Sequence, residues 1–249
     1  MKLCALIFLV YLAIGAVAGK KNKLCSQILD KLSDLEDLIN KKQDCCEPKP
    51  VAPPSSCKEI YDKDSASPNK AYDLKLGDED DTFNFDSKAW SSMSPVSPEN
   101  GDTGLDDLET LLPTYWSTSF SKICLGMKVD GVTRFLPLHQ KADSLYALIG
   151  DGQYRATSLG RDAWKKLIGP SASLQRNCNR EGFNSRGSGS VKTRIGIIAN
   201  QEGDCRTPDS FIGFGGAELS FKNVCGNRAA YFPDHGNKNT KAFGYIFVQ

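Results

Sequence analysis

The chain has 249 residues, with 31 lysines and arginines against 30 aspartates and glutamates, a net charge of +1 and only two histidines. This near-neutral balance gives no general electrostatic reason to expect nucleic acid as a partner. With only His139 and His235, and no C-x-x-C pair, the sequence also argues against a zinc site of cysteines and histidines.

Residues 1–18 predict a secretory signal peptide. They contain one early lysine, an apolar run, and small residues at Ala16 and Ala18, which is the pattern of a cleavage site. The run is short for a membrane helix, and no later segment approaches the ~20 apolar residues that a span needs. We therefore expect a secreted, extracellular protein without a membrane span, with an uncleaved anchor as the alternative.

Residues 19–46 predict a short coiled-coil stalk. From Cys25 to Ile39, apolar residues alternate in steps of three and four, the spacing of a coiled-coil seam. A lone helix of this length is marginal in water, so interchain disulfides would have to lock the bundle. The expected interchain cysteines are Cys25, Cys45 and Cys46. This predicts a homo-oligomer, a trimer or higher; the alternative is an amphipathic helix that packs on its own domain, with intrachain disulfides.

A proline-rich linker and a large head follow the stalk. Residues 47–56 contain four prolines and predict a semi-rigid spacer. Residues 57–249 form a head long enough for one hydrophobic core. The acidic run 78–86 lacks the glycine and glutamate that an EF-hand loop needs, so we expect a solvated acidic loop.

The regular elements of the head are predicted from periodicity and turn residues. Helices are expected at 105–112 and 160–171, the second with Thr157 or Ser158 as N-cap and a stop at Gly169. Strands are expected at 122–129, at 132–138, from 144 into a glycine-rich turn, and at 194–200, 210–216 and 242–249. Short strands, few helices and long loops predict an α+β head that disulfides help to stabilise.

Eight cysteines remain once the signal peptide is removed, and an even number outside the cell favours disulfides. Cys205 and Cys225 flank a glycine-rich segment and are the first expected pair. Cys124 and Cys178 are the second. Cys57 is then left to bond with a stalk cysteine or with another chain.

Two parts of the head resemble known proteins. CKEI at 57–60 resembles the entry to fibrinogen-related domains, where a cysteine after a stem opens the globular unit. RIGIIANQEGDC, FIGFGG and VCGN, followed by a final strand, are similar in order to the end of intelectins, which are secreted calcium-dependent lectins. The block from GQYRATSLGRDAWKKLIG onward resembles fibrinogen-like proteins of cnidarian secretions and skeletal matrices. These resemblances imply a fibrinogen-related, lectin-like head.

The loops between residues 200 and 239 carry many carboxylates and amides, the oxygen ligands that calcium prefers. The expected calcium ligands are Asn200, Glu202, Asp204, Asp234 and Asn237. The expected ligand-binding residues are Asn200, Glu202, Asp209, Asn227, Tyr231 and His235, with Tyr231 placed to stack on a sugar. The alternative is that asparagine, aspartate and glycine gather here because turns need them.

Motifs of catalysis are missing from the sequence. Neither histidine accompanies a G-x-S-x-G motif, and the glycines of GDGQYRATSLG lack the spacing of a phosphate-binding loop. We therefore expect a secreted binding protein, not an enzyme, with glycans or glycoproteins as partners and Ca²⁺ as the ion. The alternative is a structural protein of an extracellular or skeletal matrix without a defined small ligand.

Overall fold

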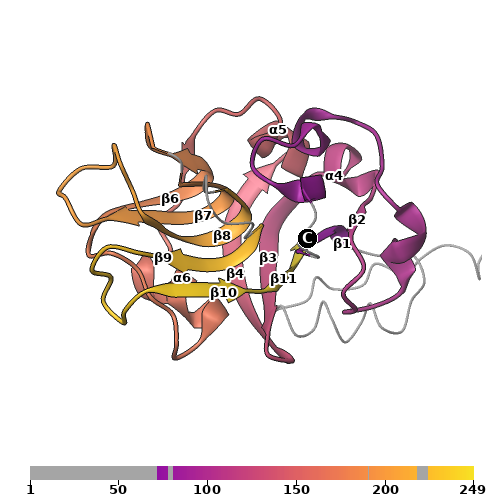
Figure 1. Cartoon of the computed structure of the whole chain (residues 1–249). Coiled ribbons are helices and arrows are strands. Elements are labelled where there is room, and N and C mark those ends of the chain that lie inside the picture. Colours follow the sequence, from indigo (N-terminus) through magenta and orange to yellow (C-terminus); the bar gives the residue numbers. More distant parts are fainter. Residues whose placement is uncertain (1–71, 78–80, 190, 218–223) are drawn as a thin grey trace, which may run out of the picture. The chain divides into compact units, whose positions relative to one another are not determined.

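The computed structural model describes residues 72–77, 81–189, 191–217 and 224–249 (Figure 1). The predicted signal peptide, stalk and linker at residues 1–56 lie outside this part. So do four of the cysteines that were assigned roles, namely Cys25, Cys45, Cys46 and Cys57.

Five of the described strands form an antiparallel sheet, sheet A, in the order β2-β1-β11-β3-β4 (Figure 1). Their bounds are β1 (Tyr72–Leu76), β2 (Thr110–Leu111), β3 (Phe120–Val129), β4 (Val132–Ala142) and β11 (Phe243–Val248). β3 and β4 form a hairpin whose two turn residues, Asp130 and Gly131, have φ of 49° and 76°. Positive φ at both positions matches the twist of the strands, and an Asp-Gly pair favours such a turn.

The other six described strands form an antiparallel sheet, sheet B, in the order β10-β9-β8-β7-β6-β5. Their bounds are β5 (Arg155–Ala156), β6 (Asn177–Arg186), β7 (Lys192–Asn200), β8 (Ser210–Ala217), β9 (Cys225–Ala229) and β10 (Lys238–Lys241). β7, β8 and β9 are buried along almost their whole length, which explains their apolar and glycine-rich sequences.

A row of glycines crosses sheet B. Gly182, Gly196, Gly213 and Gly226 are paired in register across β6, β7, β8 and β9. A Cβ added to Gly196 would lie 2.3 Å from the carbonyl oxygen of Ile212. The strands therefore approach one another along this row too closely for any side chain.

Few of the described residues are helical. The 3₁₀ helices are η1 (Asp81–Phe83), η2 (Lys88–Ser91) and η3 (Pro98–Asp102), and the α-helices are α4 (Thr114–Ser117), α5 (Leu145–Ile149) and α6 (Arg161–Ile168). α6 buries Trp164, Leu167 and Ile168 and contacts β3 and β4 of sheet A as well as β7 and β8 of sheet B. One hydrophobic core therefore includes residues of both sheets.

The predicted α+β fold class is wrong, because the strands of two antiparallel sheets make up most of the regular structure in the described residues and the helices are few and short. The longest described helix is α6, with eight residues, and no coiled-coil helix is present in the described ranges. The predicted helix at 105–112 is also wrong, since this segment is irregular and ends in β2. The predicted strand at 144 is instead α5, whose N-cap Ser144 accepts a hydrogen bond from the Ala147 amide.

The second half of the acidic run is not a solvated loop. Phe83 and Phe85 are 0% and 4% exposed, and the ring of Phe83 packs edge-on against Trp90. Asp86 forms an ion pair with Lys192 of β7, with an N–O distance of 2.6 Å. The aromatic residues of this run therefore anchor it to the core, while residues 78–80 lie outside the described part.

The predicted disulfide pairs are wrong. Cys178 is bonded to Cys205, which joins β6 to the loop between β7 and β8. Cys225 is a free thiol that is 1% exposed, because it lies in β9 and faces the core. Cys124 is also disulfide-bonded, but not to Cys178.

None of the helices in the described ranges has the length and apolar character to cross a membrane.

Candidate ligand-binding site

α6 is held in place by Glu181 of β6. The Glu181 carboxylate accepts hydrogen bonds from the amides of Leu159 and Gly160, at 3.0 and 2.8 Å, and from the Trp164 indole nitrogen, at 2.7 Å. The Thr157 hydroxyl donates a fourth hydrogen bond to the same carboxylate. Thr157 is therefore not the N-cap, which is Gly160, and Glu181 fixes the two residues that lead into the helix by accepting from their amides.

The segment that follows α6, residues 172–176, joins the polar loops at one end of sheet B. Its Gln175 is fully buried, and its side-chain amide donates to the Tyr231 carbonyl at 3.0 Å and to the Asp209 carboxylate at 3.3 Å. The same nitrogen contacts the Gln201 side-chain oxygen. Gln175 therefore connects the β7–β8 loop to the connection between β9 and β10.

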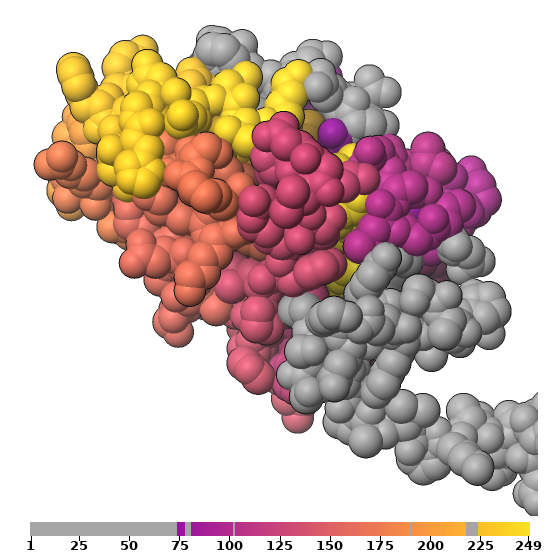
Figure 2. Space-filling model, turned by 90° about the horizontal axis from the view of Figure 1, so that it is seen from below, coloured from indigo at the N-terminus to yellow at the C-terminus, as the bar shows by residue number. Residues whose placement is uncertain are grey.

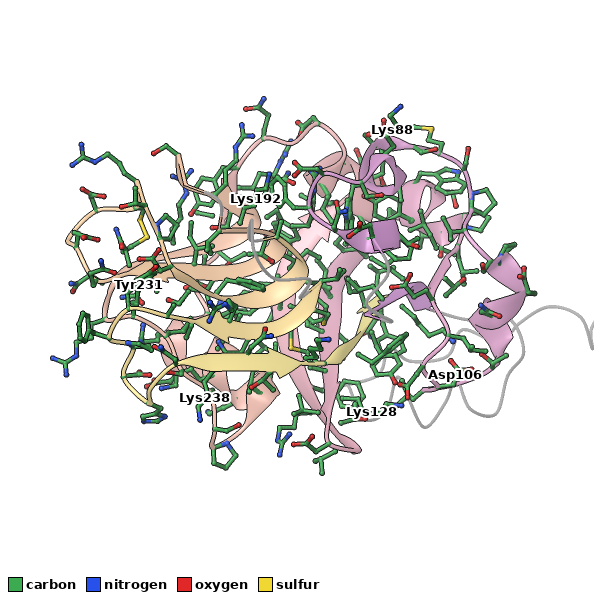
Figure 3. All side chains as sticks on the ribbon, viewed as in Figure 1. Lys88, Asp106, Lys128, Lys192, Tyr231 and Lys238 are labelled. Carbon is green, nitrogen blue, oxygen red and sulfur yellow. A yellow bond between two sulfur atoms is a disulfide. The ribbon has the colours of Figure 1, made fainter. Side chains whose placement is uncertain are left out.

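Tyr231 and Phe232 form an exposed aromatic pair at this end of the sheet, where Figure 3 shows Tyr231 at the outer edge of the ribbon. The two residues are 62% and 88% exposed. Both have left-handed backbone conformations, with φ of 51° and 63°, which cost free energy for bulky residues. Two hydrogen bonds hold this turn: the Gln175 side chain donates to the Tyr231 carbonyl, and the amide of Asp234, two residues after Phe232, donates to the Leu174 carbonyl. The rest of the fold therefore stabilises a strained turn that leaves two large aromatic rings exposed to water.

Asp209 is the half-buried carboxylate beside this pair. Burial and the nearby charge of Glu202 raise its pKa, against the hydrogen bond from Gln175 and the charge of Arg228. Glu202 itself is exposed and accepts a hydrogen bond from the Gln201 side chain. The structure thus brings three of the predicted ligand-binding residues, Glu202, Asp209 and Tyr231, to one end of sheet B.

Three other predicted ligand-binding residues are used by the fold itself. The buried Asn227 side chain binds the Ser173 amide and carbonyl, each at 2.8 Å. The buried Asn200 side chain donates to the Asp204 carbonyl. His235 makes its hydrogen bonds to residues 172 and 173. The Asn227 and Asn200 side chains and the Nδ1 atom of the exposed His235 therefore fix the loops through contacts with backbone.

The predicted calcium ligands do not form one cluster. Asp234 forms ion pairs with Arg161 and Lys165 of α6, both at 2.8 Å, and accepts a hydrogen bond from the Leu174 amide. Burial raises the pKa of Asp234, but the hydrogen bonds from these groups outweigh it, so that the pKa lies well below its usual range. Asp204 instead pairs with Arg206.

No group of three or more histidine, cysteine, aspartate or glutamate residues is arranged to hold a metal ion within the described ranges. Asn237, the fifth predicted ligand, is exposed. The calcium prediction therefore finds no assembled ligand set in this part of the chain.

Sequence reasoning missed Gln175 and Phe232. A single glutamine after an apolar segment carries no signal, because its role depends on three loops that are distant in sequence. Phe232 had a weak signal, namely two adjacent aromatic residues directly before the turn-forming Pro233.

In comparisons with known proteins, no family model, curated protein or solved structure matched this chain. The resemblance to fibrinogen-related proteins and intelectins therefore has no support beyond the short motifs that suggested it.

Proposed function

We propose that the head is a carbohydrate-binding module and that Tyr231 and Phe232 form its sugar platform. The observation that carries this proposal is the exposure of both rings on a backbone that is strained at both positions. Strained conformations persist where the surrounding structure enforces them, and they gather at ligand sites. A sugar ring has an apolar face that aromatic rings can cover, and hydroxyls that need polar partners.

The polar partners lie next to the platform. Asp209 and Glu202 offer carboxylate oxygens that accept hydrogen bonds from hydroxyls, and Gln201 offers both a donor and an acceptor. Gln175 fixes the position of this group relative to the Tyr231 carbonyl, so little ordering is needed on binding.

The proposal includes an extracellular location. It is supported by the leader-like residues 1–18 and by the Cys178–Cys205 disulfide, since oxidising compartments favour such bonds.

A glycan array tests the proposal with a variant in which both aromatic residues are replaced, Tyr231→Gly with Phe232→Gly. Glycine adopts positive φ without strain, so the turn should persist while the rings are lost. We expect binding to weaken on the order of tenfold or more, given about 1 kcal/mol for each aromatic contact. Parallel arrays with EDTA test the separate prediction of calcium.

The matched control is Met93→Ala, which removes another exposed apolar side chain, 58% exposed, far along the chain from the platform. This variant should bind like the wild type. Wild-type protein that binds no glycan, or a double glycine variant that binds as well as the wild type, contradicts the proposal.

A further inference from the structure

Charge is divided unequally between the two parts of the head. Residues 57–152 contain 9 lysines and arginines and 17 aspartates and glutamates, whereas residues 153–249 contain 14 and 7. The first part supplies β1 to β4 of sheet A, and the second supplies all of sheet B together with β11. The near-zero net charge of the whole chain therefore hides an acidic and a basic part.

Five basic residues on α6, on the segment that follows it and on β10 make up what we term the cationic face. They are Arg161, Lys165, Lys166, Arg176 and Lys238. Two of them share a single carboxylate, that of Asp234. Among the described residues, no carboxylate lies within ion-pair distance of the other three, and two of those are exposed.

The elements that carry the cationic face are in contact with one another. Arg161 donates to the Leu174 carbonyl at 2.7 Å, which places the start of α6 against the segment that contains Arg176. Seen from below, the yellow C-terminal residues lie directly against the salmon segment that includes α6 (Figure 2).

The cationic face also adjoins the aromatic pair. Arg176 follows Gln175, which binds the Tyr231 carbonyl, and Lys238 pairs with Ala229 across β9 and β10. Figure 3 shows Tyr231 and Lys238 toward the same end of the ribbon and Lys88 at the opposite side. Two members of the cationic face, Arg176 and Lys238, therefore belong to segments that contact or adjoin the connection carrying the aromatic pair.

We infer that the ligand is a sulfated polysaccharide, whose sulfate groups bind the cationic face while a sugar ring stacks on Tyr231 and Phe232. This inference rests on the proposed carbohydrate-binding function and specifies its ligand class. Three exposed or half-buried carboxylates belong to the same segments, Asp162 to α6 and Glu202 and Asp209 to the β7–β8 loop. These carboxylates would repel a small anion bound at the rings themselves. A polymer avoids this repulsion, because one unit can stack on the rings while sulfates of neighbouring units reach the cations.

Binding of the purified full chain to immobilised heparin and to chemically desulfated heparin tests the inference. The two probes share a backbone and differ in their sulfates. We expect the sulfated form to bind more tightly, and this preference to fall as NaCl rises from about 50 to about 200 mM, because bound cations release counterions from a polyanion.

The variant that tests the site combines Arg176→Gln with Lys238→Gln. Exposed ion pairs are individually weak, so affinity for heparin should fall on the order of tenfold when two are lost, while affinity for the desulfated form changes little. The matched control is Lys88→Gln, which removes one exposed cation from the acidic part and should leave the preference intact.

Equal affinity for both probes overturns the inference and leaves the proposed function standing. Failure to bind either probe, or any glycan of the array, overturns both. Lys88→Gln removes one charge and the double variant removes two, so an equal loss of affinity per charge removed shows that net charge alone acts, and overturns the site. Salt-sensitive self-association that the double variant abolishes assigns the cationic face to the acidic part of a second copy, which also overturns it.

Discussion

Asp234 illustrates, at the scale of a single residue, how a side chain expected to bind calcium is engaged by the protein's own cations. Its carboxylate accepts from Arg161, Lys165 and the Leu174 amide, and 24% of its side chain is exposed. Arg161 and Lys165 lie one helical turn apart, and through Asp234 they attach α6 to the connection that carries Tyr231 and Phe232.

Asp234→Asn should lower the free energy of unfolding by about 2 kcal/mol at pH 7, because two charge-assisted hydrogen bonds are weakened. The folded protein holds the pKa of Asp234 below its unfolded value of about 4, so this stabilisation is present above pH 4 and is lost as the pH falls toward the folded pKa. Urea denaturation at a series of pH values should therefore show wild type and variant converging below pH 4.

Asp143→Asn is the control, since Asp143 is exposed, and its unfolding free energy should stay within about 0.5 kcal/mol of the wild type. An Asp234→Asn protein as stable as the wild type at pH 7 would mean that the ion pairs contribute nothing.

The site was only partly predictable from its residues. Turn segments attract asparagine and aspartate whether the side chains face water or bind their own backbone, so sequence alone does not separate the two cases. Tyr231 and Asp209 do lie at the candidate site, whereas Asn200 and Asn227 point inward and fix loops. That difference arises from tertiary contacts, above all with residues 172–176.

At the scale of the element, Glu181 stabilises a helix from a neighbouring strand. Its carboxylate accepts four hydrogen bonds. Glu181 is only 9% exposed, so water cannot replace a hydrogen bond that a substitution removes. In Glu181→Gln, one acceptor oxygen becomes an amide NH₂ group, which faces N–H or O–H donors and cannot accept their hydrogen bonds. We expect the free energy of unfolding to fall by about 2–4 kcal/mol, measured by urea denaturation with tryptophan fluorescence.

Glu99→Gln makes the same chemical change on an exposed residue of η3 and should alter stability by less than about 0.5 kcal/mol. Similar stability of the Glu181 and Glu99 variants would contradict a capping role for Glu181.

The predictability of the elements followed their length and their apolar pattern. α6 and the strands β3, β4, β7, β8 and β11 were predicted correctly, since each has a clear helical period or a run of apolar and β-branched residues. α5 was missed because five apolar-rich residues look alike as helix and as strand. β6 was missed because its sequence, NCNREGFNSR, is mostly polar, and it is a strand because of its pairing with β7.

At the scale of the whole molecule, the fold class was wrong because the expected helix at 105–112 is absent and several strands were missed, and strand order was not predictable at all. Neither the placement of β11 between β1 and β3 nor the glycine row across sheet B can be read from local periodicity. The cysteine pairs failed for the same reason. Cys205 and Cys225 are near in sequence, but one lies in a loop and the other faces the core.

Cystine mapping of the folded protein should recover the Cys178–Cys205 peptide and leave Cys225 as a thiol. Replacing both cysteines of the bond, Cys178→Ala with Cys205→Ala, should lower the free energy of unfolding by ~3.5 kcal/mol, the chain-entropy value for a separation of 27 residues. Thermal and urea denaturation measure this loss.

Iodoacetamide provides the check on Cys225. Burial, and to a lesser extent Glu109, raises the pKa of this thiol, so alkylation should be negligible in native buffer and rapid in urea. Fast alkylation of the native protein, or a peptide that links Cys225 to Cys205, would contradict the cysteine arrangement described here.

During synthesis on the ribosome, β1 and β3 emerge long before the strand that joins them. β1 ends at Leu76 and β3 at Val129, whereas β11 begins only at Phe243. Until then both strands have an unpaired edge on the side where β11 will lie, and such edges template aggregation. A nascent chain interrupted between these points would therefore need a chaperone to shield the unpaired edges of β1 and β3. The full-length chain should fold slowly, because the pairing of β11 with β1 is non-local.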